Sequence, residues 1–305
     1  MVHYPDFKYK ISQPVVEDLK FRISQTRWTD EIKGSGWQFG ANLSYIKELA
    51  DYWLNEFDWR KTEDEINRYP NYVTEIDGIK IHFLHIKGKG KRSVPLIVTH
   101  GWRGSILEMS KLIDPLTTDP DFSFDLIIHS IPGFGFSQKI NNPGCNLWFI
   151  GDLWSKLIKK VGYEKILAQG GDFGAGINTA LAIKHPENML GLHLNYIHSS
   201  YFPFLSQAEK LTEEEIRFQK SAEDWSAIEG AYSHQHRTKP LTLAYGLNDS
   251  PVGLCAWILE KFYSWSDCNG NIESVFTKDE LLSNVSLYWF TETIHSSIRL
   301  YNENI

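Results

Sequence analysis

The sequence predicts an α/β protein built around a mostly parallel β-sheet. Short apolar runs alternate with helical patterns between about residues 93 and 196. A strand, a helix and a second strand in that order form a right-handed crossover between parallel strands. Helical patterns with one short hairpin precede this stretch, and helical patterns without strands follow it. We therefore expect a sheet-containing core with further structure on both sides.

These differences in sequence pattern divide the chain into three regions. We expect an amino-terminal region at residues 1–92, a core at 93–196 and a polar, helical region at 197–305. Domains commonly have about 100–200 residues, so a chain of 305 suits one large domain or two joined ones. The length is ample for a hydrophobic core without disulfides or metals.

The amino-terminal region predicts two helices followed by a hairpin. Apolar residues recur at helical spacing in residues 15–23 and again in residues 43–57. Two runs that alternate apolar and polar residues, 72–76 and 80–85, then flank the dipeptide Asp77-Gly78. This dipeptide is typical of a tight turn between antiparallel strands.

The core predicts a repeated strand–helix pattern. The apolar runs expected to form strands are residues 96–98, 125–128, 165–169 and 191–194. The helical patterns between them are residues 106–112, 153–161 and 175–184. Active sites in such sheets lie beyond the carboxyl ends of the strands, so we expect catalytic residues in the turns that follow these runs.

Three helix starts are predicted in the last region. Thr212 with Glu215, and Thr277 with Glu280, have the spacing of a capping box. Pro251 suits the first position of another helix, because a missing N–H costs nothing there. This region is therefore expected to be helical.

Composition excludes several classes of protein. The net charge is −7 and no long Lys/Arg run occurs, so we expect no nucleic-acid groove. The three cysteines, Cys145, Cys255 and Cys268, form no C-x-x-C pair and no disulfide framework. No signal peptide and no stretch of about 20 apolar residues is present, which favours a soluble, cytoplasmic protein. Nucleotide and metal-protease motifs are absent, so we expect no cofactor and no metal.

The sharpest motif lies in the turn after the third core strand. Asp172 stands between an apolar strand and a helix, with Gly170 and Gly174 on either side. This is the pattern of a nucleophile elbow, with Asp where Ser is usual. The helix N-terminus favours a carboxylate, and a carboxylate can attack an alkyl carbon. The alternative is that Asp172 only caps the helix.

The loop after the first core strand, His100–Ser105, predicts an oxyanion hole. In the hydrolase architecture this loop supplies one backbone N–H, and the residue after the nucleophile supplies the other. Trp102 and Phe173 occupy these positions. A plain glycine-rich turn is the alternative, and His100 is expected to bond within the turn.

Together with the loop Ile131–Ser137, whose Phe134 or Phe136 could wall an apolar pocket, these motifs resemble the microsomal-type epoxide hydrolase family of α/β-hydrolases. The resemblance extends over essentially the whole chain. Further runs resemble the family's N-terminal domain and helical cap: residues 52–59, 67–70, 232–235, 238–240, 247–254, 260–262 and 296–301. It implies an α/β-hydrolase fold with an N-terminal extension and a cap.

The resemblance also implies a mechanism for opening a small apolar epoxide toward a vicinal diol. Asp172 would attack an epoxide carbon to form an alkyl-enzyme ester, and Tyr232 and Tyr301 of the cap would hydrogen-bond the epoxide oxygen. Members of the family act on foreign aryl epoxides in detoxification and on terpenoid hormone epoxides. A homodimer is compatible with the sequence, which does not decide the oligomeric state.

The chain departs from the family pattern in several places. Arg103 replaces a Pro of the oxyanion loop, which puts the Trp102 N–H geometry in question. Phe173 replaces a Trp, and His129, a weak candidate for a substitute base, replaces another Pro. The last histidine, His295, lies in a cap-like helix. The positions that match the family's base His and its orienting carboxylate are not found, and we expect the final strands to be missing.

Two alternatives to an active epoxide hydrolase follow. A truncated homologue that is catalytically incomplete would bind apolar ligands without turnover. A haloalkane dehalogenase also uses an elbow aspartate, but it would need halide-binding Trp or Asn donors in place of a tyrosine pair. It also lacks the amino-terminal region seen in this sequence.

Overall fold

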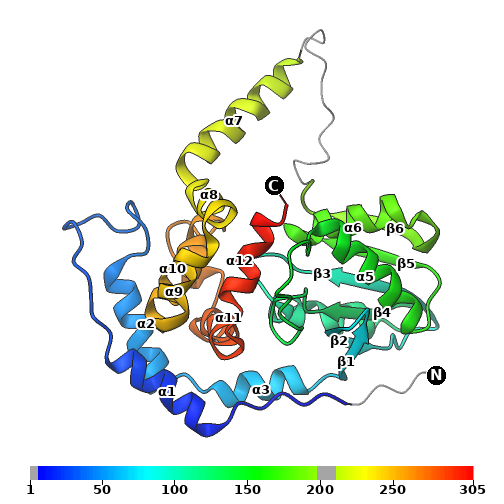
Figure 1. Ribbon diagram of the computed structural model, residues 1–305, viewed down its shortest axis with the longest axis horizontal. Helices are drawn as coiled ribbons and strands as arrows, with labels where there is room; N and C mark the ends of the chain where they lie inside the picture. The colour runs from blue at the N-terminus through cyan, green and yellow to red at the C-terminus, as the bar shows by residue number, and fades with distance from the viewer. Residues whose placement is uncertain (1–5, 198–210, 305) are drawn as a thin grey trace.

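The computed structural model describes residues 6–197 and 211–304. The first five residues of the expected amino-terminal region, residues 198–210 of the expected cap and Ile305 lie outside the described residues. Figure 1 shows a sheet with flanking helices on one side of the molecule and a group of helices on the other.

The described chain forms one six-stranded sheet in the order β1-β2-β4-β3-β5-β6. The strands are β1 (Asn71–Ile76), β2 (Ile79–Ile86), β3 (Arg92–Thr99), β4 (Phe122–His129), β5 (Ile166–Gly170) and β6 (Met189–Leu194). β4, β3, β5 and β6 pair in parallel, whereas β1 pairs with β2 and β2 with β4 in antiparallel fashion. The predicted mostly parallel sheet is confirmed.

The hairpin forms where the sequence predicts it and joins the sheet of the core. Asp77 and Gly78 both have positive φ angles, 51° and 78°. Such a turn matches the twist of antiparallel strands. Because β2 pairs with β4, with Phe83 opposite His129, the hairpin extends the parallel sheet.

Helices cover the sheet and connect its strands. These elements are the short helices η1 (Ile106–Met109) and η2 (Pro186–Asn188) with α4 (Ser110–Thr117), α5 (Leu147–Lys160) and α6 (Phe173–Lys184). The strand residues Ile97, Ile127 and Ile128 are completely buried, as is Trp154 of α5. Apolar strands buried on both faces are typical of parallel sheets, whose crossover helices cover them.

The remaining helices come from both ends of the chain. They are α1 (Gln13–Ser24), α2 (Leu43–Asn55), α3 (Trp59–Asn67), α7 (Glu213–Glu229), α8 (Ala231–Thr238), α9 (Pro240–Asp249), α10 (Pro251–Ser264), η4 (Ile272–Ser274), α11 (Lys278–Thr291) and α12 (Ile294–Asn302). Both predicted capping boxes form at the starts of α7 and α11, and Pro251 opens α10. Of the described helices, none is both long and apolar enough to cross a membrane.

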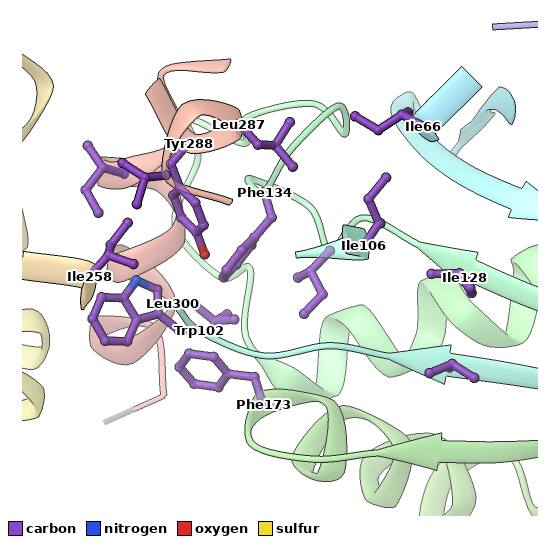
Figure 2. Packing of buried hydrophobic residues seen from close by; sticks show 14 of the residues in the cluster. Ile66, Trp102, Ile106, Ile128, Phe134, Phe173, Ile258, Leu287, Tyr288 and Leu300 are labelled. Atoms are coloured by element: carbon purple, nitrogen blue, oxygen red, sulfur yellow. The ribbon is translucent and has the colours of Figure 1, made fainter. Parts of the chain in front are cut away.

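The group α8–α12, here called the cap, packs against the turns that follow the core strands. Figure 2 shows Trp102, from the turn after β3, beside Ile258 of α10 and Leu300 of α12, with Phe173 close by. Trp102, Ile258 and Leu300 are at most 4% exposed. The carboxyl ends of β3 and β5 therefore meet the cap.

Candidate active site

Asp172 occupies a sharp turn between β5 and α6. Its backbone has φ 49° and ψ −129°, a conformation that few residues other than glycine adopt. Glycines make room for this turn. A Cβ on Gly174 would lie 2.0 Å from the carbonyl oxygen of Thr99, and one on Gly101 would lie 2.2 Å from Oδ1 of Asp172. The predicted elbow geometry is therefore present.

The Asp172 carboxylate is held by two backbone donors. Phe173 N–H donates to Oδ1 at 2.7 Å and Trp102 N–H donates to the same oxygen at 2.9 Å. Asp172 thus also caps α6, so a position in an elbow and a role as helix cap are compatible for this residue. Within residues 6–197 and 211–304, no hydrogen bond to the other oxygen, Oδ2, is found.

The surroundings of Asp172 shift its pKa in opposite directions. Burial raises the pKa of this carboxyl above its ordinary value of 3.8. The two N–H donors and the Arg103 charge lower it in part, so the net direction is upward. A carboxylate that loses its hydration is a better nucleophile at pH values where it is still ionised.

The turn that follows Trp102 is tied to α11. Asn284 Nδ2 donates to the Arg103 carbonyl at 2.8 Å, and the Tyr288 hydroxyl donates to the Gly104 carbonyl at 2.8 Å. The Ser105 hydroxyl donates to Asn284 Oδ1 at 2.9 Å. The Trp102–Arg103 peptide bond is cis. With Arg103 in the loop, the Trp102 N–H still reaches Asp172.

The two cap tyrosines lie together over Trp102. The Tyr232 and Trp102 rings stack with centroids 5.5 Å apart, and the Tyr301 and Tyr232 centroids are 5.7 Å apart. Tyr301 also contacts Phe173 at 4.6 Å between ring centroids. The Tyr301 hydroxyl is buried without a well-formed hydrogen bond to any described residue. The structure therefore brings all five predicted site residues together.

Burial keeps both phenols protonated. It raises the pKa of Tyr232 to about 12, and burial together with the Asp172 charge raises the pKa of Tyr301 well above 10. Each hydroxyl also affects the other's pKa, so the two groups are close. Both phenols can donate hydrogen bonds at neutral pH.

A charged cluster between α7 and the cap, not predicted from the sequence, packs against Tyr232. Lys261 Nζ lies 2.9 Å from Oε2 of Glu229 and 5.4 Å from the centroid of the Tyr232 ring. The Trp265 indole N–H donates to the same Glu229 oxygen at 3.1 Å. Glu229 is the last residue of α7 and Tyr232 lies in the first turn of α8, so the cluster ties this junction to α10.

Other residues considered in the sequence have structural roles. His100 Nδ1 donates to the Gly101 carbonyl and its Nε2 accepts from Ile131 N–H, as expected of a residue that bonds within the turn. His129 bonds the Thr99 hydroxyl at 2.9 Å and its ring packs on Trp154, so it does not serve the site.

The structure also places Phe134, Phe136 and His295, which the sequence analysis discussed. Phe134 is buried near His100, whereas Phe136 packs on Tyr9 of the amino-terminal segment. Phe134 alone therefore lies on the side of the site. His295 lines a surface groove between α1, α9 and α12 that does not include Asp172.

Two polar residues near the site were not predicted from the sequence. His236 is completely buried, and its ring contacts Trp102 and Tyr301 at centroid distances of 4.6 and 4.9 Å. Glu108 lines a cavity of about 390 Å³ together with Arg103. The sequence offered no motif for His236, because its role depends on how α8 packs. In the described part of the chain, no three His, Cys, Asp or Glu residues are grouped as metal ligands.

A parallel sheet with an aspartate at the elbow and a helical cap over it defines the α/β-hydrolase class. Residues 94–225 match the family model for the alpha/beta hydrolase fold, and residues 4–109 match the model named Epoxide hydrolase N terminus. The chain belongs to the microsomal-type epoxide hydrolase family, as the comparisons with relatives show.

Two relatives and one solved structure illustrate the match. Epoxide hydrolase 1 of Oryctolagus cuniculus is 36% identical over 98% of this chain and 72% of the relative. Juvenile hormone epoxide hydrolase 2 of Ctenocephalides felis is 37% identical over 98% of this chain and 69% of the relative. The crystal structure of juvenile hormone epoxide hydrolase from Bombyx mori superposes with a TM-score of 0.86 at 33% identity, covering 99% of this chain and 76% of that one.

Proposed function

We propose that this protein is an epoxide hydrolase that opens apolar epoxides through an ester on Asp172. The observation that carries the proposal is the asymmetric carboxylate. Oδ1 accepts two backbone N–H groups, while Oδ2 has no hydrogen bond among the described residues. Relatives over nearly the whole chain are named epoxide hydrolases, which supports the same reaction class.

The first step is a displacement at an epoxide carbon. Oδ2 of Asp172 attacks, an Oδ2–C bond forms and the ring C–O bond breaks. The electron pair of the broken bond goes to the former ring oxygen. Tyr232 and Tyr301 hydrogen-bond this oxygen, and one of them transfers its proton as the alkoxide develops. Two neutral phenols suit this role, because donors aimed at a developing charge stabilise the transition state.

The second step is hydrolysis of the ester. Water adds to Cγ of Asp172, and negative charge develops on Oδ1. The Cγ–Oδ2 bond then breaks and the diol leaves, with one water proton on the leaving oxygen and the other returned to the phenol that was deprotonated in the first step. Oδ1 already accepts the N–H groups of Trp102 and Phe173, which are thus placed as an oxyanion hole for this step. The step also needs a base to activate the water. In the described part of the chain, no histidine hydrogen-bonds to Asp172, and we assign no residue to that role.

The regions contribute differently in this proposal. The core (93–196) supplies the nucleophile and the oxyanion hole, and the cap region (197–305) supplies the phenols. The amino-terminal region (1–92) contributes α3 residues such as Thr62 to the cavity that Arg103 lines.

Intact-protein mass spectrometry after incubation with styrene oxide tests ester formation. We expect one added epoxide mass, mapped to Asp172, and no adduct in Asp172→Asn, which keeps the size of the side chain. Release of the diol would show complete turnover. A stable stoichiometric adduct would favour the homologue that binds epoxides without turnover. If no adduct forms and no diol is released, the proposal is wrong.

A further inference from the structure

We infer that His236 positions the phenol of Tyr301, and that its Nδ1–H donates a hydrogen bond to the Tyr301 oxygen when a substrate binds. The inference rests on the proposed function and adds a positioning residue to it. His236 does not touch the epoxide. It acts through Tyr301, because it directs the proton of this hydroxyl toward the epoxide oxygen.

His236 lies within the aromatic cluster over Asp172. It follows Tyr232 by four residues in α8, so both side chains lie on one face of this helix. The imidazole is completely buried. Its ring centroid lies 4.6 Å from that of Trp102, 5.5 Å from that of Tyr232 and 4.9 Å from that of Tyr301. His236 thus contacts both proposed proton donors and the residue whose backbone N–H binds Asp172.

A hydrogen bond from Trp257 fixes which ring nitrogen of His236 carries the proton. The Trp257 indole N–H donates to Nε2 of His236 at 3.2 Å. An indole N–H can only donate, so Nε2 is unprotonated in this bond. The imidazole is neutral, because burial and the Lys261 charge lower the pKa of His236 to about 3. The ring proton is therefore on Nδ1, which can only donate a hydrogen bond.

The Tyr301 oxygen is the acceptor that suits this buried donor. Among the described residues, neither Nδ1 of His236 nor the Tyr301 hydroxyl has a hydrogen-bond partner. Of the described side chains in ring contact with His236, the two tryptophans carry indole donors, whereas Tyr232 and Tyr301 carry oxygens that can accept. The Tyr301 ring is the nearer of the two tyrosine rings.

This hydrogen bond sets the direction of the Tyr301 hydroxyl. A hydroxyl oxygen that accepts an N–H points its own proton to another acceptor, which in the proposed reaction is the epoxide oxygen. When Tyr301 transfers this proton, negative charge develops on its oxygen, and the Nδ1–H donor of His236 stabilises that charge. No proton leaves His236 in this step. Hydrogen bonds of this kind are often poorly aligned without a ligand and shorten when the substrate binds.

Rates of adduct formation with styrene oxide test the role of His236. His236→Leu removes both ring nitrogens, and we expect the rate to fall about tenfold, because one hydrogen bond to a developing charge is lost. His236→Gln keeps an acceptor for Trp257 and a donor for Tyr301, so it should restore most of the rate. Loss of packing alone would slow both variants alike. His234→Leu is the matched control, because His234 lies in the same helix but is exposed.

Heteronuclear NMR of nitrogen-labelled histidine provides a readout that does not depend on catalysis. At neutral pH the proton of His236 should be on Nδ1 in the wild type and should occupy both nitrogens in Trp257→Phe. Benzyl methyl ether offers an ether oxygen without a strained ring. It should move the Nδ1–H resonance downfield, because a phenol that donates a hydrogen bond becomes a stronger acceptor. Propylbenzene, which lacks the oxygen, should not move it, and the ether should have no effect in Tyr301→Phe.

The outcomes separate this inference from the proposed function. A wild-type proton on Nε2, an Nδ1–H resonance that the ether does not move, or adduct formation in a folded His236→Leu variant as fast as in His234→Leu would each overturn the inference. Absence of any adduct in the wild type would instead contradict the proposed function, and the NMR result would still decide whether His236 binds Tyr301. Thermal unfolding shows that each variant retains its fold, and the wild-type spectra do not depend on any variant.

Discussion

The Trp102 indole stacks on the phenol ring of Tyr232, with 12° between the two ring planes. The same residue donates its backbone N–H to Oδ1 of Asp172. One residue of the core thus contacts both the proposed nucleophile and a proposed proton donor of the cap. Displacement of the Trp102 loop should therefore disturb both partners of the proposed reaction.

Removing either phenol hydroxyl should slow ester formation. We expect Tyr232→Phe and Tyr301→Phe each to reduce the rate of adduct formation with styrene oxide by about 10–100-fold, because one donor remains in each variant. Rapid-quench mass spectrometry measures the rate. Tyr245→Phe is the control, since Tyr245 is a cap tyrosine that is 72% exposed. Rates equal to that of the control would show that the phenols take no part.

Two variants should differ in the pH dependence of ester formation. The ionised carboxylate is the nucleophile, so the rate should rise with pH through the pKa of Asp172, with a midpoint above 3.8. The Arg103 charge lowers this pKa, so Arg103→Met should move the midpoint upward. The packed surroundings of the Glu108 carboxyl and the Asp172 charge raise the pKa of Glu108, and the Arg103 charge lowers it in part.

Like charges oppose each other's ionisation, so Glu108→Gln should move the midpoint for Asp172 downward. If Glu108 is still protonated at the pH of that midpoint, the midpoint should stay in place. Rate profiles between pH 4 and 9 measure the midpoint in both variants. An upward shift in Glu108→Gln, or a downward shift in Arg103→Met, would contradict the electrostatic account.

Two helical glycines should respond differently to replacement by alanine. In Gly174→Ala the new Cβ would lie 2.0 Å from the Thr99 carbonyl oxygen, so we expect unfolding free energy to fall by about 1–3 kcal/mol or more. Gly246 lies in α9 with no atom within 4 Å of such a Cβ. Gly246→Ala should stabilise by about 0.5–1 kcal/mol, because alanine favours the helix. Urea unfolding compares the two, and equal stabilities would refute the packing argument.

The Glu229–Lys261 pair should contribute more to the free energy of unfolding than a similar pair at the surface. Lys261 is 8% exposed and Tyr232 packs near it. We expect Lys261→Met to lower the free energy of unfolding by about 1–3 kcal/mol, because it leaves the half-buried Glu229 carboxylate without its cation. Lys220→Met removes the exposed partner of Asp224 in α7 and should cost at most about 0.5 kcal/mol. Thermal and urea unfolding measure both, and equal losses would contradict a role for burial.

Local patterns were sufficient to predict most of the fold and the sharp turn that carries Asp172. The parallel strands, the Asp77-Gly78 hairpin and the capping boxes of Thr212 and Thr277 each depend on neighbouring residues, and each forms as expected. The elbow of Asp172 is also local, because its glycines and its helix lie within a few positions.

The features of the site that were not predicted from the sequence depend on long-range packing. In the sequence, Arg103 only put the geometry of the Trp102 N–H in question. The environment of Arg103 depends on Asn284 and Phe262, which are far away in the chain. His236 had no motif, because its importance comes from the rings of Trp102 and Tyr301 around it. The aromatic cluster over Asp172 likewise follows from how α8 and α12 pack.

The pairing of β2 with β4 has a consequence for how the chain folds. The hairpin lies early in the sequence, yet its hydrogen bonds reach the strand that ends at His129. Cleavage between Ile86 and Arg92 would therefore not release an autonomous amino-terminal fragment, since each piece would expose an unpaired strand edge. We expect the hairpin and the parallel strands to lose amide protection together in hydrogen exchange, as one cooperative unit.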